Sequence, residues 1–299
     1  MNIDSKLNNQ LIFNEKCYKF KKIIFKENLF TIDATYVIHL NKNGRFNNII
    51  NQLKEFKPTN IVYILFNKGY KNCKKTNNIK YPAHDLIDCF FQIFKHSKNK
   101  NYNNILILED DFIFDKNKIS NKNHIFNINN FLEKKINSNF TYYLGCVPWL
   151  ISPIDFKFLH FRNFGSTGTH SVVYSKIFRE YLLNNYSKIK HIKDWDVLIY
   201  MFSKNKYVYH TPLCYQLFPD TENSKTSGNF NLIFNYLRHI PKIIFKILNL
   251  HNSIEPGYSI LYTFSKVLFF FILILFYFTL RKVKVALICK NGFGPAGLS

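Results

Sequence analysis

The stretch Asn104-Ile105-Leu106-Ile107-Leu108-Glu109-Asp110-Asp111-Phe112-Ile113-Phe114-Asp115 joins an apolar run to three consecutive acids. The apolar run 105–108 is typical of a strand that is buried on both faces. The three carboxylates that follow it repel one another and lose hydration unless a positive charge lies close to them. A divalent cation held by oxygen ligands would supply that charge. The alternative is a solvated acidic turn at the end of a strand.

The composition is strongly basic and rich in aromatic residues. The chain has 299 residues, of which 47% are hydrophobic and 18% aromatic, and this content supports a large core and excludes disorder throughout. Its 41 Lys and Arg residues against 19 Asp and Glu give a formal net charge of +22. Such an excess favours anionic partners, namely nucleic acid, a membrane face or phosphorylated substrates. The codon bias of an AT-rich genome would explain it equally well, because the lysines are scattered.

The N-terminal half alternates strand-like and helix-like segments. Residues 35–40 and 61–66 predict strands, and the apolar spacing of residues 46–56 predicts a helix between them. This order predicts a βαβ unit and a parallel sheet, whose strands would end at a nucleotide site. Arg45, in the turn after the first strand, would meet a phosphate there, and the alternative is an ordinary surface arginine. A helix over 82–95 then leads into the acidic stretch.

Small and acidic residues recur after the acidic stretch. Residues 165–170 predict a loop whose small side chains let the backbone approach a ligand closely. Asp194 and Asp196 precede a predicted helix over 197–202, so one of them could cap that helix while the other acts as a general base. His210 follows a strand-like run and is a candidate metal ligand, and the alternative is a structural histidine.

The C-terminal part has membrane character. Residues 232–250 show a basic amphipathic pattern broken at Pro241, as in segments that lie on an anionic membrane. Residues 260–280 are apolar apart from Lys266 and a few small polar residues, and they reach the length of a spanning helix. Basic residues, which favour the cytoplasmic side, begin directly afterwards at Arg281. We predict a membrane-spanning or interfacial helix, with a buried core helix as the alternative.

Neither the N-terminus nor the cysteines point to secretion. The first ten residues are polar and lack an apolar signal core. The six cysteines lack the spacing of a metal clip, and nothing about them requires an oxidising compartment.

Taken in order, these segments resemble glycosyltransferase family 25, the type that includes LPS and collagen β-galactosyltransferases. The resemblance covers roughly residues 34–217, and His39 stands where the family usually has Asn. The residues that carry it are Val37-Ile38-His39-Leu40 with Arg45, Leu108-Glu109-Asp110-Asp111, the run from Gly168 to Ser175, Asp194 or Asp196, and Pro212 with Gln216.

The resemblance implies a GT-A-like, Rossmann-related α/β fold with a mainly parallel sheet flanked by helices. It implies a metal-dependent transfer of a hexose, with galactose as the named candidate, from a UDP-sugar to a glycan or protein acceptor, with inversion. The expected metal is Mn²⁺ or Mg²⁺, bound by Asp110, Asp111 and His210, and the expected bases are Asp194 and Asp196. The expected donor-binding residues are Leu40, Arg45, His84, Glu109, Asp110, Gly168 and Thr169. No nucleic acid is expected as a partner.

We predict an N-terminal extension over residues 1–33, a catalytic domain over 34–228 and a membrane-associated part over 229–299, with the catalytic domain facing the cytosol. Two other functions remain open. A metal-dependent phosphatase or nuclease also uses acidic clusters, although no second acidic strand motif accompanies the first. A catalytically inactive, membrane-anchored scaffold or binding protein could keep the same fold.

Overall fold

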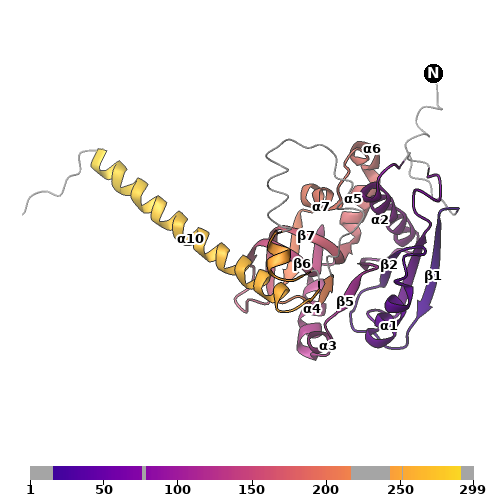
Figure 1. The fold of residues 1–299 in the computed structure, drawn as a ribbon. Helices are drawn as coiled ribbons and strands as arrows, with labels where there is room; N and C mark the ends of the chain where they lie inside the picture. Colours follow the sequence, from indigo (N-terminus) through magenta and orange to yellow (C-terminus); the bar gives the residue numbers. More distant parts are fainter. Residues whose placement is uncertain (1–15, 76–78, 217–242, 251, 291–299) are drawn as a thin grey trace, which may run out of the picture.

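A computed structural model describes residues 16–75, 79–216, 243–250 and 252–290 (Figure 1). Its core is a seven-stranded sheet in the order β1-β3-β2-β4-β7-β6-β8, and a separate two-stranded sheet pairs β5 with β9. The strands are β1 (Tyr18–Ile24), β2 (Ala34–Leu40), β3 (Ile61–Asn67), β4 (Asn104–Glu109), β5 (Phe112–Phe114), β6 (Phe140–Pro153), β7 (His160–Ser175), β8 (Asn205–Tyr209) and β9 (Cys214–Gln216).

Helices cover both faces of the large sheet. They are α1 (Phe46–Phe56), α2 (Pro82–Asn99), α3 (Lys116–Ile119), α4 (Lys122–Lys134), α5 (Lys176–Asn184), α6 (Tyr186–Ile189), α7 (Trp195–Phe202) and α10 (Gly257–Lys290). Residues 243–247 form a further helical turn. Most of the predicted amphipathic segment over 232–250 lies outside the described residues.

The large sheet is mainly parallel in direction. β2 runs parallel to β3 and β4, and β6 runs parallel to β8. β1 is antiparallel to β3, and β7 is antiparallel to both β4 and β6, so these two strands oppose the other five. The predicted α/β fold, with a mainly parallel sheet flanked by helices, is therefore confirmed.

The chain reverses its winding at strand β2. From β2 it crosses through α1 to β3 on one side, and then through α2 to β4 on the other side. The carboxyl ends of β2 and β4 therefore flank a topological switch point, where open α/β sheets leave a crevice for ligands. The acidic stretch lies there because it follows β4 directly.

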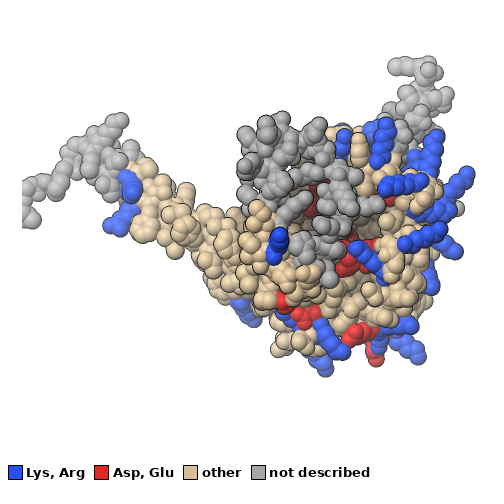
Figure 2. Space-filling model, viewed as in Figure 1, with Lys and Arg blue, Asp and Glu red and all other residues tan. Residues whose placement is uncertain are grey.

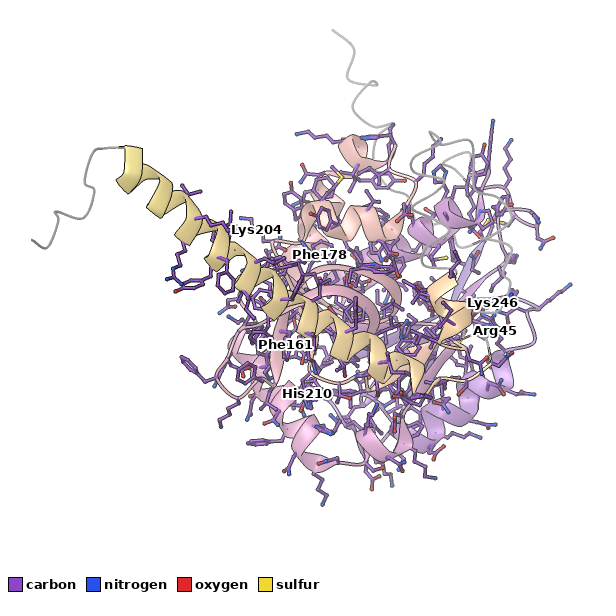
Figure 3. The ribbon with its side chains drawn as sticks, turned by 60° about the vertical axis from the view of Figure 1, so that its left-hand side comes forward. Arg45, Phe161, Phe178, Lys204, His210 and Lys246 are labelled. Atoms are coloured by element: carbon purple, nitrogen blue, oxygen red, sulfur yellow. A yellow bond between two sulfur atoms is a disulfide. The ribbon has the colours of Figure 1, made fainter. Side chains whose placement is uncertain are left out.

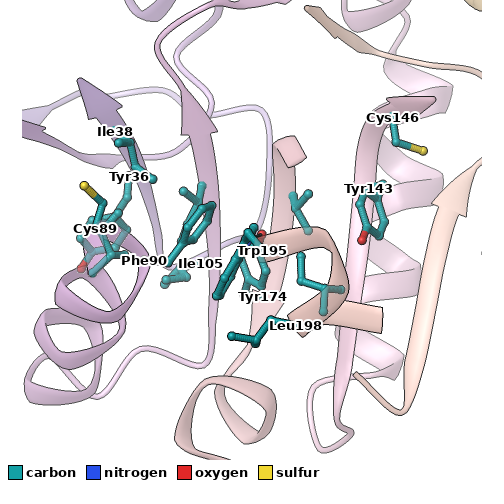
Figure 4. Close-up of a cluster of buried hydrophobic side chains, with 14 of the residues drawn as sticks. Tyr36, Ile38, Cys89, Phe90, Ile105, Tyr143, Cys146, Tyr174, Trp195 and Leu198 are labelled. Carbon is teal, nitrogen blue, oxygen red and sulfur yellow. Dashed lines mark hydrogen bonds between the residues drawn. The ribbon is translucent and has the colours of Figure 1, made fainter. Parts of the chain in front are cut away.

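Each face of the sheet has its own hydrophobic core. On one face, α1 and α4 contribute buried residues such as Leu53 and Ile128. On the other, α2, α5, α7 and α10 pack on the sheet, and the rings of Phe90 and Trp195 stack with centroids 4.0 Å apart. Trp195 Nε1 donates a hydrogen bond to the hydroxyl of Tyr174, so the indole is buried without an unpaired polar atom (Figure 4).

Strands β6 and β7 form a long, bulged hairpin that the sequence did not predict. Residues 148–153 belong to β6 and residues 160–162 to β7, and residues 165–170, expected to be a loop, lie within β7. Repeated register shifts between Tyr143 and Ile151 bend the hairpin, so that β7 begins against β8 as well as β6. Bulges interrupt strict alternation, and this hides such a strand from a pattern of period two.

The folded domain extends beyond the predicted boundaries at both ends. β1 lies within the predicted extension 1–33 and pairs along its whole length with β3. Cys17, just before β1, forms a disulfide with Cys73, with a Cα–Cα distance of 5.6 Å. At the other end, Tyr258 and Tyr262 of α10 are fully buried in the domain core. The first turns of α10 therefore belong to the domain, because their apolar face completes the core beside β6.

Beyond the domain, α10 continues as a free apolar rod. It is the one helix among the described residues that is long and apolar enough to cross a membrane, with a mean hydropathy of 2.2 in its most apolar 18-residue window. From Phe270 to Val283 its apolar side chains are exposed on all sides, a pattern that suits lipid and not a water-facing surface. Figure 2 shows this rod without charges until a basic group near its far end. The structure thus favours membrane association over the alternative of a buried core helix.

Gly145 gives a direct test of the hairpin's packing. A Cβ on Gly145 would lie 1.7 Å from the carbonyl oxygen of Cys214, whereas one on Gly165 would meet nothing closer than 3.9 Å. We expect Gly145→Ala to destabilise the full chain by about 2–3 kcal/mol, since backbone must move to make room, and Gly165→Ala to leave it nearly unchanged. Thermal unfolding in detergent measures the difference, and equal melting temperatures would contradict this packing.

Candidate functional site

The centre of the site is an ion pair between Arg45 and two consecutive aspartates. Arg45 Nη1 lies 2.7 Å from Asp110 Oδ1 and 3.2 Å from Asp111 Oδ2, and both carboxylates are about 15% exposed. Asp110 also accepts hydrogen bonds from the backbone N–H of Leu40, at 3.2 Å, and from the side chain of Asn43. Arg45, in the turn after β2, therefore supplies part of the positive charge that the three consecutive acids require.

Glu109 lies on the β7 side of this pair. The hydroxyl of Thr169 donates a 2.7 Å hydrogen bond to Glu109 Oε1. Burial, followed by repulsion from Asp111, raises the pKa of Glu109 from 4.5 to about 8. Glu109 therefore holds a proton at neutral pH in the metal-free protein, which lowers the negative charge that Arg45 has to balance.

Asp196, in the first turn of α7, is a further carboxylate of the site. Burial is the largest cause that raises its pKa from 3.8 to about 7, and the backbone N–H of Gly168 donates to it. Gly168 has a φ of +88°, a backbone conformation that favours glycine. Asp196 is also close enough to Glu109 to contribute to the raised pKa of that group.

Asp194 and Asp196 have different roles in the structure. Asp194 is the N-cap of α7, where its Oδ1 accepts a 3.0 Å hydrogen bond from the backbone N–H of Val197. Its carboxylate is on the exposed side of the helix start. Since capping already uses Asp194, the partly buried Asp196 is the better candidate for proton transfer.

Two predicted site residues lie away from the carboxylates in every contact that the structure records. His84 packs against the ring of Tyr81, and its buried Nε2 has no hydrogen-bond partner among the residues that the structure describes. His210 packs against His124 and Tyr209, and burial lowers its pKa to about 4. No group of three or more His, Cys, Asp or Glu side chains that could hold a metal occurs among the described residues, so the structure does not bring His210 together with the two aspartates.

Asp110 and Asp111 are better suited to a metal ion that binds together with the substrate than to one that stays bound in the protein without substrate. Asp111 Oδ1 is buried and lacks a hydrogen-bond partner in the described structure. Burial raises the pKa of Asp111, and a cation would oppose this effect. Mg²⁺ and similar hard cations commonly bind one or two carboxylates and complete their shell with water and substrate phosphates. Asp110 and Asp111 would suffice for that arrangement.

Several residues of the site had no site role assigned from the sequence, although His39 and Gln216 were named in the family resemblance. Gln216 Nε2 donates a 2.8 Å hydrogen bond to Asp111 Oδ2, and the backbone of Gln216 bonds to the hydroxyl of Tyr258 on α10. His39 Nδ1 lies 3.8 Å from Asp110 Oδ2. Asn43 could have been found from its place in the turn after the first strand. The link from Asp111 to Tyr258 joins segments far apart in sequence and has no local signal.

Comparison with known proteins gives only distant similarities. No family model matches, and no curated protein matches. Among solved structures, a glycosyltransferase involved in glycosylation of the major capsid of PBCV-1 has a TM-score of 0.35 and 11% identity, covering 60% of this chain and 82% of that one. A mannose-1-phosphate geranyltransferase from Thermus thermophilus has a TM-score of 0.33 and 9% identity, covering 59% and 73%.

A protein from STIV, whose name carries no activity, gives a TM-score of 0.35 and 12% identity, covering 58% of this chain and 80% of that one. Similarity at this level establishes neither family nor activity. Family 25 membership therefore stays a resemblance, and the function has to come from the chemistry of the site.

The raised pKa of Glu109 predicts how stability varies with pH. In the presence of a chelator, the folded protein keeps a proton on Glu109 that the unfolded chain releases above its ordinary pKa of 4.5. The free energy of unfolding should therefore fall as pH rises from about 5 to 8. Glu109→Gln should flatten this fall and stabilise the protein at pH 8 by on the order of 3 kcal/mol.

The matched control is Glu133→Gln, at an exposed site on α4, which should keep the pH profile of the wild type. The measurement is chemical denaturation at pH 5 and pH 8. An unchanged profile for Glu109→Gln would show that Glu109 is ionised in the folded protein.

Proposed function

We propose that the chain is a membrane-attached glycosyltransferase that moves a hexose, with galactose as the named candidate, from a UDP-sugar to a hydroxyl of a glycan or protein acceptor. The observation that carries the proposal is the cluster of partly buried carboxylates Glu109, Asp110, Asp111 and Asp196 beside Arg45 at the switch point of the sheet. Burying this much negative charge is costly unless a positively charged or metal-bound ligand completes the site.

The turn between β2 and α1 supplies features that suit a sugar diphosphate. α1 begins directly after Arg45, has no side-chain cap and has no acid in its first turn. Backbone N–H groups at a helix N-terminus favour anions, so the diphosphate can lie between this helix start and the Arg45 guanidinium. Leu40, Gly168 and Thr169 border the same crevice through their contacts with the carboxylates.

Asp110 and Asp111 would hold the divalent metal, Mn²⁺ or Mg²⁺, together with the diphosphate. When bound, such a cation supplies positive charge against which the diphosphate can leave. His210 is not in this set, because its recorded contacts are with His124, Tyr209, Leu159 and Lys266 and with none of the site's carboxylates among the described residues.

Asp196 is the proposed general base. A base works best when its pKa lies near the working pH, and burial brings the pKa of Asp196 to about 7. Asp196 takes the proton of the acceptor hydroxyl as the oxygen bonds to the anomeric carbon and the bond from that carbon to the UDP oxygen breaks. A single displacement of this kind inverts the anomeric configuration.

The two alternative functions, a metal-dependent phosphatase or nuclease and an inactive scaffold, make different use of the carboxylates. A two-metal phosphatase or nuclease needs a second group of ligands, and the described residues contain no such group. An inactive scaffold would keep the fold without using the carboxylates. The acid cluster favours the transferase over the scaffold, since an unused cluster of partly buried acids would only destabilise the domain.

We further propose that α10 anchors the domain to a membrane. The sequence favoured a cytosol-facing domain, but two observations support the opposite side. Arg281 and Lys282 follow the apolar rod and favour the cytosolic side for the far end of a spanning helix. The Cys17–Cys73 disulfide suits an oxidising compartment. Protease protection of sealed vesicles distinguishes the two orientations.

Metal and nucleotide should stabilise the protein together. For the full chain in detergent, we expect Mn²⁺ plus UDP to raise the melting temperature more than either does alone, because the metal and the diphosphate complete each other's binding. Asp111→Asn should abolish the joint effect. Asp115→Asn is the matched control, since Asp115 bonds to Tyr215 and the start of α3 and not to Arg45.

A shift with metal and an oligonucleotide, but not with UDP, would support a nuclease. No shift with any of these ligands, in a protein that unfolds cooperatively, would support the inactive scaffold.

Substitutions of Asp194 and Asp196 test helix capping and catalysis separately. UDP release from a panel of UDP-sugars should fall about 10²–10⁴-fold in Asp196→Asn, because the general base is lost. Asp194→Asn should stay close to the wild type, since Asn caps a helix as well as Asp does. In the wild type, the rate should rise with pH and level off above about 7. Equal rates for the two variants would remove Asp196 as the base.

A further inference from the structure

The tip of the β6–β7 hairpin exposes large apolar side chains to an unusual degree. Between Pro153 and Leu159, Ile154 is 40% exposed, Phe158 is 50% exposed, and Phe156 is exposed as fully as in an extended chain, at 103%. Three such side chains within five residues are costly in water, and a contiguous exposed apolar group often marks an interaction surface. Their chemistry suits a partner that is apolar itself.

The tip is a defined structure and not a loose loop. The carboxylate of Asp155 accepts hydrogen bonds from the backbone N–H groups of Leu159, at 3.1 Å, and His160, at 3.0 Å. Phe158 has a φ of +52°, which is rare for a bulky residue. Residues held in such conformations gather at functional sites, so the tip merits a functional explanation.

The tip lies beside the point where α10 leaves the domain. Lys266 Nζ donates a 2.6 Å hydrogen bond to the backbone oxygen of His210 and lies 5.2 Å from the centre of the Phe161 ring. The backbone N–H of His210 in turn bonds to the oxygen of Leu159, the last residue of the tip, at 2.9 Å. Figure 3 shows Phe161 and His210 along the same stretch of α10.

Lys266 therefore marks the boundary between the domain and the membrane. Its ammonium group turns into the domain, so the apolar rod can enter lipid from Val267 onward without carrying that charge with it. The run 267–280 is about 21 Å long at 1.5 Å per residue, shorter than the hydrocarbon core of about 30 Å. A rod of this length can cross the bilayer only if the domain lies against the membrane surface, where the bilayer thins to match the short apolar run.

Basic side chains surround the apolar tip. Lys157 belongs to the tip itself, and Lys134, Lys135 and Arg162 line the groove next to it, together with Ile154 and Asp155. Apolar side chains within a basic surround match the interface of an anionic bilayer, where rings enter the acyl boundary and cations meet the headgroups.

We propose that residues 154–158 form a second membrane contact, which inserts Phe156 and Phe158 into the bilayer interface beside α10. The domain is then held at two points, so it cannot rotate freely about the axis of α10. This contact rests on the proposed membrane attachment of α10, and it is independent of the proposed transferase activity because it requires none of the carboxylates of the site.

The test places a reporter on the tip of the full chain, reconstituted in vesicles of phosphatidylcholine and phosphatidylglycerol whose acyl chains carry bromine near the headgroup. Phe156→Trp should lose more emission in these vesicles than in unbrominated ones, after subtraction of the wild-type signal. Tyr277→Trp on the apolar rod is the positive control. Ile24→Trp, 69% exposed on the opposite edge strand, is the negative control.

Iodide in the aqueous phase separates the remaining outcomes. Quenching of Phe156→Trp by iodide but not by brominated lipid would show a tip in water and overturn the proposal. Shielding from both quenchers would show contact with a second copy of the chain and overturn it equally. Phe158→Trp repeats the measurement, so that a local disturbance at one position does not decide the result.

Discussion

The ion pair between Arg45 and the aspartates Asp110 and Asp111 is the interaction on which the site depends. Three consecutive acids follow a strand that is buried on both faces, and their charge has to be balanced where they lie. Arg45 supplies one positive charge from the neighbouring strand end, and a proton on Glu109 removes one negative charge. What remains is a partly buried carboxylate pair with an unpartnered oxygen on Asp111, an arrangement that favours a cationic ligand.

The same residues connect the site to the membrane helix. Gln216 bonds to Asp111 through its side chain and to Tyr258 through its backbone, and Tyr258 lies in the first turns of α10. Those turns are part of the hydrophobic core, and the apolar rod continues from them without a break. In the membrane attachment that we propose, one rigid helix serves both as core and as anchor and would hold the site at a fixed height above the bilayer. An acceptor presented at the membrane surface would suit such a geometry.

The bent β6–β7 hairpin contributes residues both to the carboxylate site and to the surface beside α10. Near its middle, Gly168 and Thr169 bond to Asp196 and Glu109, and at its tip the exposed phenylalanines lie beside the exit of α10. Close packing at Gly145, where a β-carbon would overlap the backbone of Cys214, keeps the hairpin against β9. One element thus contributes to the carboxylate site and to the surface that we assign to the membrane.

The sequence alone determined the α/β class, because apolar strands and amphipathic helices alternate with clear periods from residue 34 onward. It also identified the acidic stretch, Arg45, Gly168 and Thr169, since strand ends and small residues carry local signals. Tertiary structure alone decided that Asp194 caps α7 while Asp196 faces the site, that His210 packs elsewhere, and that Gln216 and Tyr258 complete the environment of Asp111. It also added β1 and the first turns of α10 to the domain. These outcomes depend on contacts between segments up to about a hundred residues apart, and the pattern within one segment does not specify its partner.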